Sequence, residues 1–156
     1  MQLTINQRMP IACAGLLAQP FDAQKIRSCA AEGGDIPFGR AVVQGTAWNQ
    51  CKLPTANTQK CIGIAAFSHA AESPVDSSNS VGYRQKSPVN VLNFGEVWMP
   101  YDSTAPTIGA ALYVVASGAN AGKATATSTN NITVPLIARM VDTTLGLVLA
   151  NLTAAI

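Results

Sequence analysis

Short apolar runs separated by Gly, Pro, Asn and Asp follow one another along most of this chain. The runs are rich in Val, Ile, Leu and Ala and lie at residues 41–44, 61–67, 89–99, 111–116, 132–141 and 145–152. Strands of this length and spacing are typical of an all-β sandwich or barrel. Gly95, in the longest run, is placed where a bulge or bend lets a strand turn a barrel corner. The Asp and Thr residues at 142–144 predict the turn of a closing hairpin.

Residues 1–36 have a different pattern. Gly15, Pro20 and the glycine pair at 33–34 interrupt every periodic stretch, and only residues 25–30 alternate weakly, as a short edge strand does. We therefore expect an extended N-terminal arm over residues 1–36, lying on the body or on a neighbouring molecule. A β-sandwich or barrel body is expected over residues 37–156, and the segment 36–43 marks the junction between the two.

The composition favours a protein that lives packed against something. Of its 156 residues, 48% are hydrophobic and 12% are charged, and the formal net charge is +2. A surface with so few charges does little to prevent association with other molecules. The positive charge is too small and too scattered to indicate nucleic acid as a partner. No apolar run reaches the roughly 18 residues that span a membrane, so we expect no membrane partner either.

The four cysteines predict no metal site. Cys13, Cys29, Cys51 and Cys61 show no Cys-x-x-Cys spacing, and the single histidine cannot complete a zinc site of the usual form. The four thiols could form two disulfides in an oxidising compartment. However, the apolar run at 9–18 contains Pro and Gly and makes a poor signal peptide, so we expect reduced thiols that behave as small hydrophobic side chains.

No motif indicates catalysis. The stretch 118–124 has two glycines before Lys123, but three residues separate the glycines where a phosphate-binding loop has four, and alanine follows the lysine. It is interpreted as a connecting loop; a helix over 119–126 is disfavoured by its threonines. His69 is the one candidate general base, and a loop histidine is the favoured interpretation. The acids are dispersed. We expect no catalytic residues, no cofactor and no metal.

The two tryptophans receive different interpretations. Trp98 lies in the longest apolar run and is expected in the core. Trp48 is flanked by Gln, Gly, Thr and Asn, which predicts partial exposure and makes it a candidate interface anchor. An exposed tryptophan can also stack on a sugar ring, so a glycan-binding surface is the alternative.

The order of several segments resembles a known family. The segments that carry the similarity lie at residues 14–18, 36–43, 52–54, 62–65, 91–97, 108–114, 137–138 and 145–148. Taken together, they resemble the small capsid cement, or decoration, proteins of tailed double-stranded DNA bacteriophages, over nearly the whole chain. The four cysteines and the polar loop at 71–80 have no counterpart in this resemblance.

The resemblance implies a fold, a function and a location. The expected fold is a jelly-roll-like β body with an extended arm, on the outer face of an icosahedral head. The expected function is to clamp adjacent major capsid proteins and stabilise the expanded shell, without enzymatic activity. The protein would be made in the cytoplasm of the bacterial host, and would bind the major capsid protein and itself as a homodimer or homotrimer.

These expectations select candidate residues for the contact with a partner. The candidates are Leu16, Leu17, Phe21, Phe38, Arg40 and Trp48. Deleting residues 1–20 is expected to weaken shell binding and leave a folded body. The alternative functions are a β-sandwich adhesion module that recognises glycans or a host surface with Trp48 and the loop 71–80, and a hydrolase that uses His69.

Overall fold

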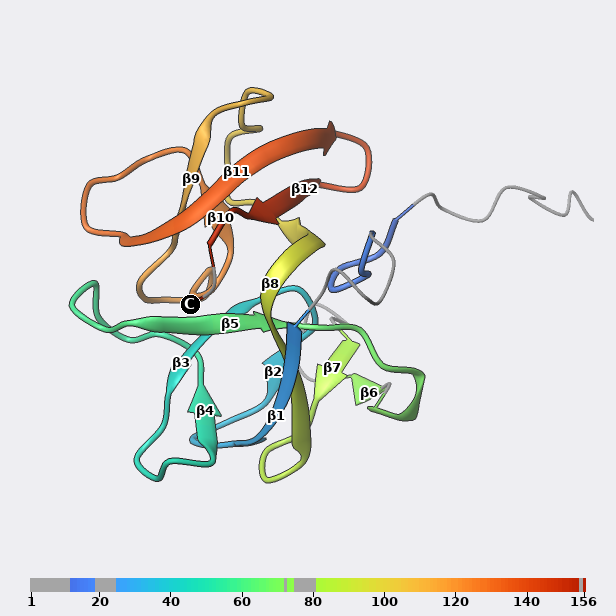
Figure 1. Ribbon diagram of the computed structural model, residues 1–156, viewed down its shortest axis with the longest axis vertical. Helices are drawn as coiled ribbons and strands as arrows, with labels where there is room; N and C mark the ends of the chain where they lie inside the picture. Colours follow the sequence, from blue (N-terminus) through green and yellow to red (C-terminus); the bar gives the residue numbers. More distant parts are fainter. Residues whose placement is uncertain (1–11, 19–24, 72, 75–80, 155) are drawn as a thin grey trace, which may run out of the picture.

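The computed structural model describes residues 12–18, 25–71, 73–74, 81–154 and 156 (Figure 1). Within these residues the regular structure is β-strand, apart from a single 3-10 turn at His69–Ala71. The described strands are β1 (Lys25–Ala31), β2 (Ile36–Pro37), β3 (Ala41–Gln44), β4 (Gln50–Lys52), β5 (Cys61–Ala65), β6 (Ser73–Pro74), β7 (Val81–Tyr83), β8 (Pro88–Pro100), β9 (Ala111–Val114), β10 (Ala124–Thr125), β11 (Ile132–Asp142) and β12 (Leu147–Leu152). The all-β prediction is confirmed.

One long sheet builds two halves that share a strand. Nine strands are hydrogen-bonded in the order β1-β4-β3-β5-β8-β12-β11-β9-β10. Because β1 also pairs with the first part of β8, the strands β1, β4, β3, β5 and β8 close into a barrel, the lower half in Figure 1. The second part of β8 pairs with β12 and begins the upper half. The strands β2, β7 and β6 form a separate small sheet.

Gly95 lies at the point where β8 passes from one half to the other. Phe94 pairs with Lys25 of the barrel, whereas Gly95 pairs with Leu152 of the upper half. The φ angle of Gly95 is 122°, in a region that side chains with a Cβ rarely adopt. The bend expected at this glycine is confirmed, and it lets β8 pair with strands of both halves.

Strand alternation divides the buried side chains between two main clusters. In β3, Val42 points into the barrel, while Ala41 and Val43 join the core of the upper half. The barrel interior is lined mostly by small residues and two thiols. The larger core joins the outside of the barrel to the inner face of β9, β11 and β12. Because successive side chains of a strand face opposite sides, a strand of the barrel wall contributes to both clusters. The two halves therefore form one continuous body.

The structure differs from the expected arm over 1–36. Residues 25–31 form β1, which pairs with β4 on one side and β8 on the other, so it lies inside the barrel wall. Residues 36–37 form β2, so the expected boundary falls within a strand. The pattern of β1 was weak because its first four residues, 25–28, are all exposed, and its buried residues, Cys29 and Ala31, have small side chains.

The stretch 119–126 forms turns and β10, in agreement with its interpretation as a connection in which a helix was disfavoured. Other differences concern short elements. The strands β2, β4, β6 and β7 are two or three residues long and were not predicted. Runs this short show no periodicity of their own, so long-range pairing alone defines them as strands.

Candidate interaction surface

Trp48 lies at the tip of the turn between β3 and β4, at the lower end of the barrel (Figure 1). Its side chain is 91% exposed, the most exposed of the large hydrophobic residues in the described part of the chain. Partial exposure was predicted, and the structure shows that the indole is almost entirely in solvent. An exposed indole on a closed turn is a typical anchor for a protein partner.

Two glutamines fix the backbone of this turn. The Gln44 amide donates to the carbonyl oxygens of Ala47, at 2.7 Å, and Gln50, at 2.9 Å. The Gln50 side-chain oxygen accepts from the Ala47 N–H at 3.0 Å. These bonds satisfy backbone groups that a turn otherwise leaves to water, so the position of Trp48 is largely set before any partner binds.

A carboxylate from outside the hairpin completes the support. Glu32, just after β1, accepts a hydrogen bond from the Thr46 N–H at 2.7 Å. Hydrogen bonds from the Thr46 side chain and backbone, with the nearby Lys52 charge, hold the pKa of Glu32 below its usual value. A Cβ at Gly45 would lie 2.5 Å from the Glu32 Oε2 atom, so glycine is required for this approach.

Leu16 and Leu17 lie on the body in the segment 12–18. Leu17 forms a β-bridge with Val97 of β8. Leu16 packs against the buried cluster that contains Trp98 and Leu149. Both leucines are partly buried, so this segment covers its own chain and leaves only part of each side chain for a partner. Phe21 lies outside the described residues.

Phe38 and Arg40 are buried, and this corrects their selection as direct contact residues. Phe38 is 3% exposed, and its ring makes edge contacts with Phe67 and Tyr83 at centroid distances of 5.1 and 5.0 Å. Arg40 is 7% exposed, and its guanidinium donates to the carbonyl oxygen of Ala121 at 2.7 Å. A hydrophobic or charged residue in a strand-like segment faces in or out according to register, which the sequence pattern at 36–43 did not reveal.

Two further exposed apolar residues, in the upper half, were missed by the sequence analysis. Ile108, before β9, and Met140, in β11, are 67% and 52% exposed. The Gly109 N–H donates to the Ala138 carbonyl oxygen at 2.8 Å, which brings the two segments together. A register shift between Ala138 and Met140 interrupts the inward and outward alternation of side chains in β11. No local feature of the sequence predicted this shift.

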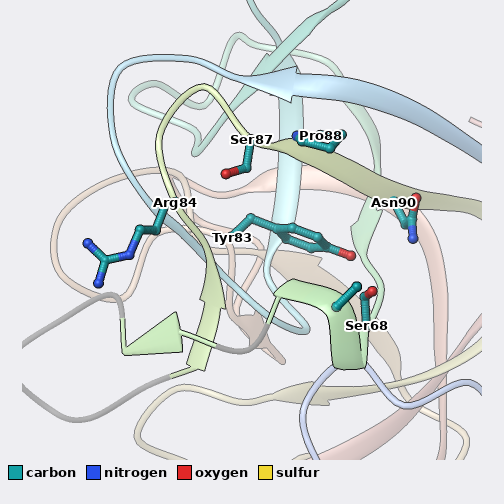
Figure 2. A pocket seen from close by; sticks show the side chains of 7 residues that line it. Ser68, Tyr83, Arg84, Ser87, Pro88 and Asn90 are labelled. Carbon is teal, nitrogen blue, oxygen red and sulfur yellow. The ribbon is translucent and has the colours of Figure 1, made fainter.

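Two side chains that could do chemistry, His69 and Tyr83, make structural contacts. The ring of His69 packs against Phe67 at a centroid distance of 4.7 Å. Tyr83, Arg84 and Asn90 are among the residues that line a pocket of about 350 Å³. Figure 2 shows that the Arg84 side chain extends away from Tyr83 and Asn90. The Tyr83 hydroxyl donates to the Ala66 carbonyl oxygen at 2.6 Å, and burial raises its pKa. In the described part of the chain, no group of three or more His, Cys, Asp or Glu residues could hold a metal ion.

The fold and this surface define a class: an all-β structural protein that presents an ordered aromatic tip to its surroundings. Among the described residues, helices of the length and apolarity needed to cross a membrane do not occur. The chain belongs to the structural cement protein family of bacteriophages (E217 gp24/Pam3 gp6), whose model matches residues 1–154. The resemblance drawn from the order of segments is thereby confirmed. Structural cement proteins are not a class of enzymes.

A solved structure shows the same fold. The chain is similar to a chain in the structure "The capsid of Myoviridae Phage XM1", with a TM-score of 0.76 and 19% sequence identity over 100% of this chain and 99% of that one. At this identity the similarity shows the fold. The search of curated proteins gives no match. The protein is therefore a structural component of a phage capsid.

Proposed function

We propose that this protein binds the outer surface of an icosahedral phage head and cements adjacent major capsid proteins, stabilising the expanded shell. The observation that carries the proposal is Trp48, exposed on a turn that three other side chains hold in place. Family membership supports a structural role in the capsid, and the tip supplies a candidate for the contact itself.

The physical properties of the tip suit a repeated protein contact. Tryptophan is enriched among the residues that dominate binding energy at interfaces. A turn that is already ordered loses little conformational entropy when it binds. Contacts of this kind, repeated at symmetry-related positions of a shell, need no deep pocket to give firm attachment.

A cement needs a second contact, and the upper half offers one. The exposed residues Ile108 and Met140 belong to the β8–β9 connection and to β11, whereas Trp48 belongs to the barrel (Figure 1). Placing one neighbour against each half would let a single chain bridge two capsid subunits. In this proposal the low charge of the chain reflects permanent burial on the shell.

The N-terminal segment is the third candidate contact. Because residues 12–18 pack on Trp98, deleting residues 1–20 would uncover a buried cluster as well as remove an arm. A deletion of residues 1–11 is the better test. We expect it to lower shell occupancy and to leave the thermal midpoint within about 2 °C, since it keeps the segment 12–18 that packs on Trp98. A large loss of stability would contradict this.

The remaining features of the proposal concern assembly and location. The protein acts as a homodimer or homotrimer at positions between capsomers, binds neither nucleic acid nor membrane, and is made in the host cytoplasm before it joins the virion. Sedimentation of the purified protein tests the oligomeric state; a concentration-independent monomer would contradict it.

The decisive experiment measures the occupancy of expanded empty capsids. Trp48→Ala is expected to weaken shell binding by about 2 kcal/mol or roughly 30-fold, as for the central residue of an interface. Val81→Ala is the matched control, since Val81 is exposed on a different sheet and is expected to bind as the wild type does. Unchanged binding by Trp48→Ala would contradict the proposal. Glycan-array binding that Trp48→Ala abolishes, without shell binding, would favour the adhesion module.

A further inference from the structure

The interior of the barrel contains two cysteines from neighbouring strands. Cys29 in β1 and Cys51 in β4 are 9% and 0% exposed and belong to the same buried cluster. In the parallel pairing of β1 with β4, Ala31 lies opposite Cys51. Cys29 is two positions before Ala31, and residues two apart share a face of a strand, so both thiols point into the barrel from adjacent strands.

The two thiols interact directly. The Cys51 thiol donates a hydrogen bond to the Cys29 sulfur. This bond, and then the charge of Arg27, lower the pKa of Cys29, while the same bond and burial raise the pKa of Cys51. Cys29 is therefore the thiol that ionises first, and Cys51 keeps its proton beside it. The thiolate is the nucleophilic form of cysteine.

Cys61 lies in a different environment. Cys61 lies in β5, where its thiol donates to the Gly63 carbonyl oxygen at 3.4 Å and belongs to the rim of the other core. Burial raises the pKa of Cys61 to about 11. Cys61 thus belongs to a different cluster from Cys29 and Cys51 and serves as an internal control.

We propose that Cys29 and Cys51 are a modification site, at which a small hydroperoxide oxidises the pair to an internal disulfide across the β1–β4 seam. The Cys29 thiolate attacks the peroxide oxygen; the O–O bond breaks, hydroxide leaves, and Cys29 becomes a sulfenic acid. The Cys51 sulfur then attacks the Cys29 sulfur, the S–O bond breaks, and water leaves with the Cys51 proton. Two thiols are oxidised by two electrons and one hydroperoxide is reduced.

The cross-link would act at a short seam of the barrel wall. The pairing of β1 with β4 covers only two residue pairs, Ala30 with Gln50 and Ala31 with Cys51. A disulfide there closes a loop of roughly 20 residues and restricts the unfolded chain. The timing rests on the proposed function: thiols stay reduced in a bacterial cytoplasm, and a particle released from the cell leaves that reducing environment.

The test uses the full-length protein and a peptide map. Trypsin cuts after Arg27, Arg40, Lys52 and Lys60, which puts each of the four cysteines on a separate peptide. Protein treated with hydrogen peroxide is denatured, alkylated with N-ethylmaleimide and digested. The expected result is the loss of two alkylation sites and one cross-linked species that joins peptides 28–40 and 41–52. Four alkylated cysteines, or a cross-link through Cys13 or Cys61, would overturn the proposal.

Stability and variants give a second measurement. The oxidised protein is expected to melt roughly 5–10 °C higher than the reduced protein, and a reductant should reverse the shift. Cys61→Ser should keep both the cross-link and the shift, whereas Cys29→Ser should lose both. A shift that persists in Cys29→Ser would overturn the proposal. These measurements need no capsid, so they succeed or fail independently of shell binding, and the wild-type peptide map does not depend on whether a variant folds.

Discussion

The two tryptophans of this protein occupy opposite kinds of environment. Trp48 stands on the β3–β4 turn with 91% of its side chain exposed, while Trp98 in β8 is 6% exposed beneath the segment 12–18. Both regions are ordered by hydrogen bonds. Side chains support the backbone around Trp48, whereas main-chain bonds hold the segment over Trp98, including Gly15 N–H to the Trp98 oxygen at 2.7 Å.

The difference in exposure between the two tryptophans indicates different roles for the two regions. A chain segment that covers an aromatic side chain contributes to the stability of the monomer through buried apolar area. A rigid turn that holds an aromatic side chain in water gains nothing from it within the monomer, so its benefit must come from a partner. The comparison therefore separates residues that keep the body folded from residues that are proposed to contact the shell, and mutations at the two tryptophans test it.

The largest effect is expected at Trp98. Trp98→Ala should lower the free energy of unfolding by about 3–5 kcal/mol, because it leaves a cavity between β8, β12 and the segment 12–18. Trp48→Ala should stay within about 0.5 kcal/mol of the wild type, as for an exposed side chain. Urea denaturation followed by circular dichroism measures both. Equal losses in the two variants would break the comparison.

The next effect is expected at Gly15, where the covering segment meets the body. Gly15 has a φ of 80°, and a Cβ there would lie 2.7 Å from the Phe67 nitrogen. Gly15→Ala should therefore cost about 2–4 kcal/mol, from the left-handed backbone and from the clash.

Gly109 is the matched control for this change. Its φ is 83°, but nothing lies within 4 Å of the added Cβ. Gly109→Ala should lose only the backbone part, about 1–2 kcal/mol. If the two variants melt at the same temperature, the close approach at Gly15 does not stabilise the docked segment.

Arg40 tests whether a polar residue of the segment 36–43 behaves like Trp98. Its guanidinium donates to the carbonyl oxygens of Ala119 and Ala121, which ties the barrel to the loop before β10. Arg40→Met keeps much of the side-chain length and removes these bonds. We expect a loss of about 1.5–3 kcal/mol in the free energy of unfolding, with shell binding of the folded fraction unchanged. A loss of shell binding without a loss of stability would show that Arg40 contributes to the interface.

The smallest effect concerns Glu32 and sharpens the account of the Trp48 turn. Because the pKa of Glu32 is lower in the folded state, its contribution is present above the ordinary glutamate pKa of 4.5 and is lost as the pH falls through the folded value. The protection factor of the Thr46 amide, which corrects for the intrinsic pH dependence of hydrogen exchange, should therefore fall in acid. Glu32→Gln should show faster exchange at neutral pH and no such acid step, whereas an unchanged profile would show that the carboxylate does not support the turn.

Much of this account could be predicted from local pattern. The apolar runs predicted β8, β11 and β12 within a few residues, and the bend at Gly95 followed from a glycine inside a long strand. The burial of Trp98 followed from its place in the longest run. These features depend on neighbours in the chain, which is why periodicity and glycine placement are enough to find them.

The amino-acid sequence by itself determined the all-β class, the family and the absence of any recognisable catalytic motif in its pattern. Only the tertiary structure decided that β1 completes a barrel, that Phe38 and Arg40 face inward, and that Cys29 meets Cys51. Each of these depends on strand register between segments far apart in the chain. A shift of one residue reverses which side chains are buried, and the local pattern of a short strand does not specify that register.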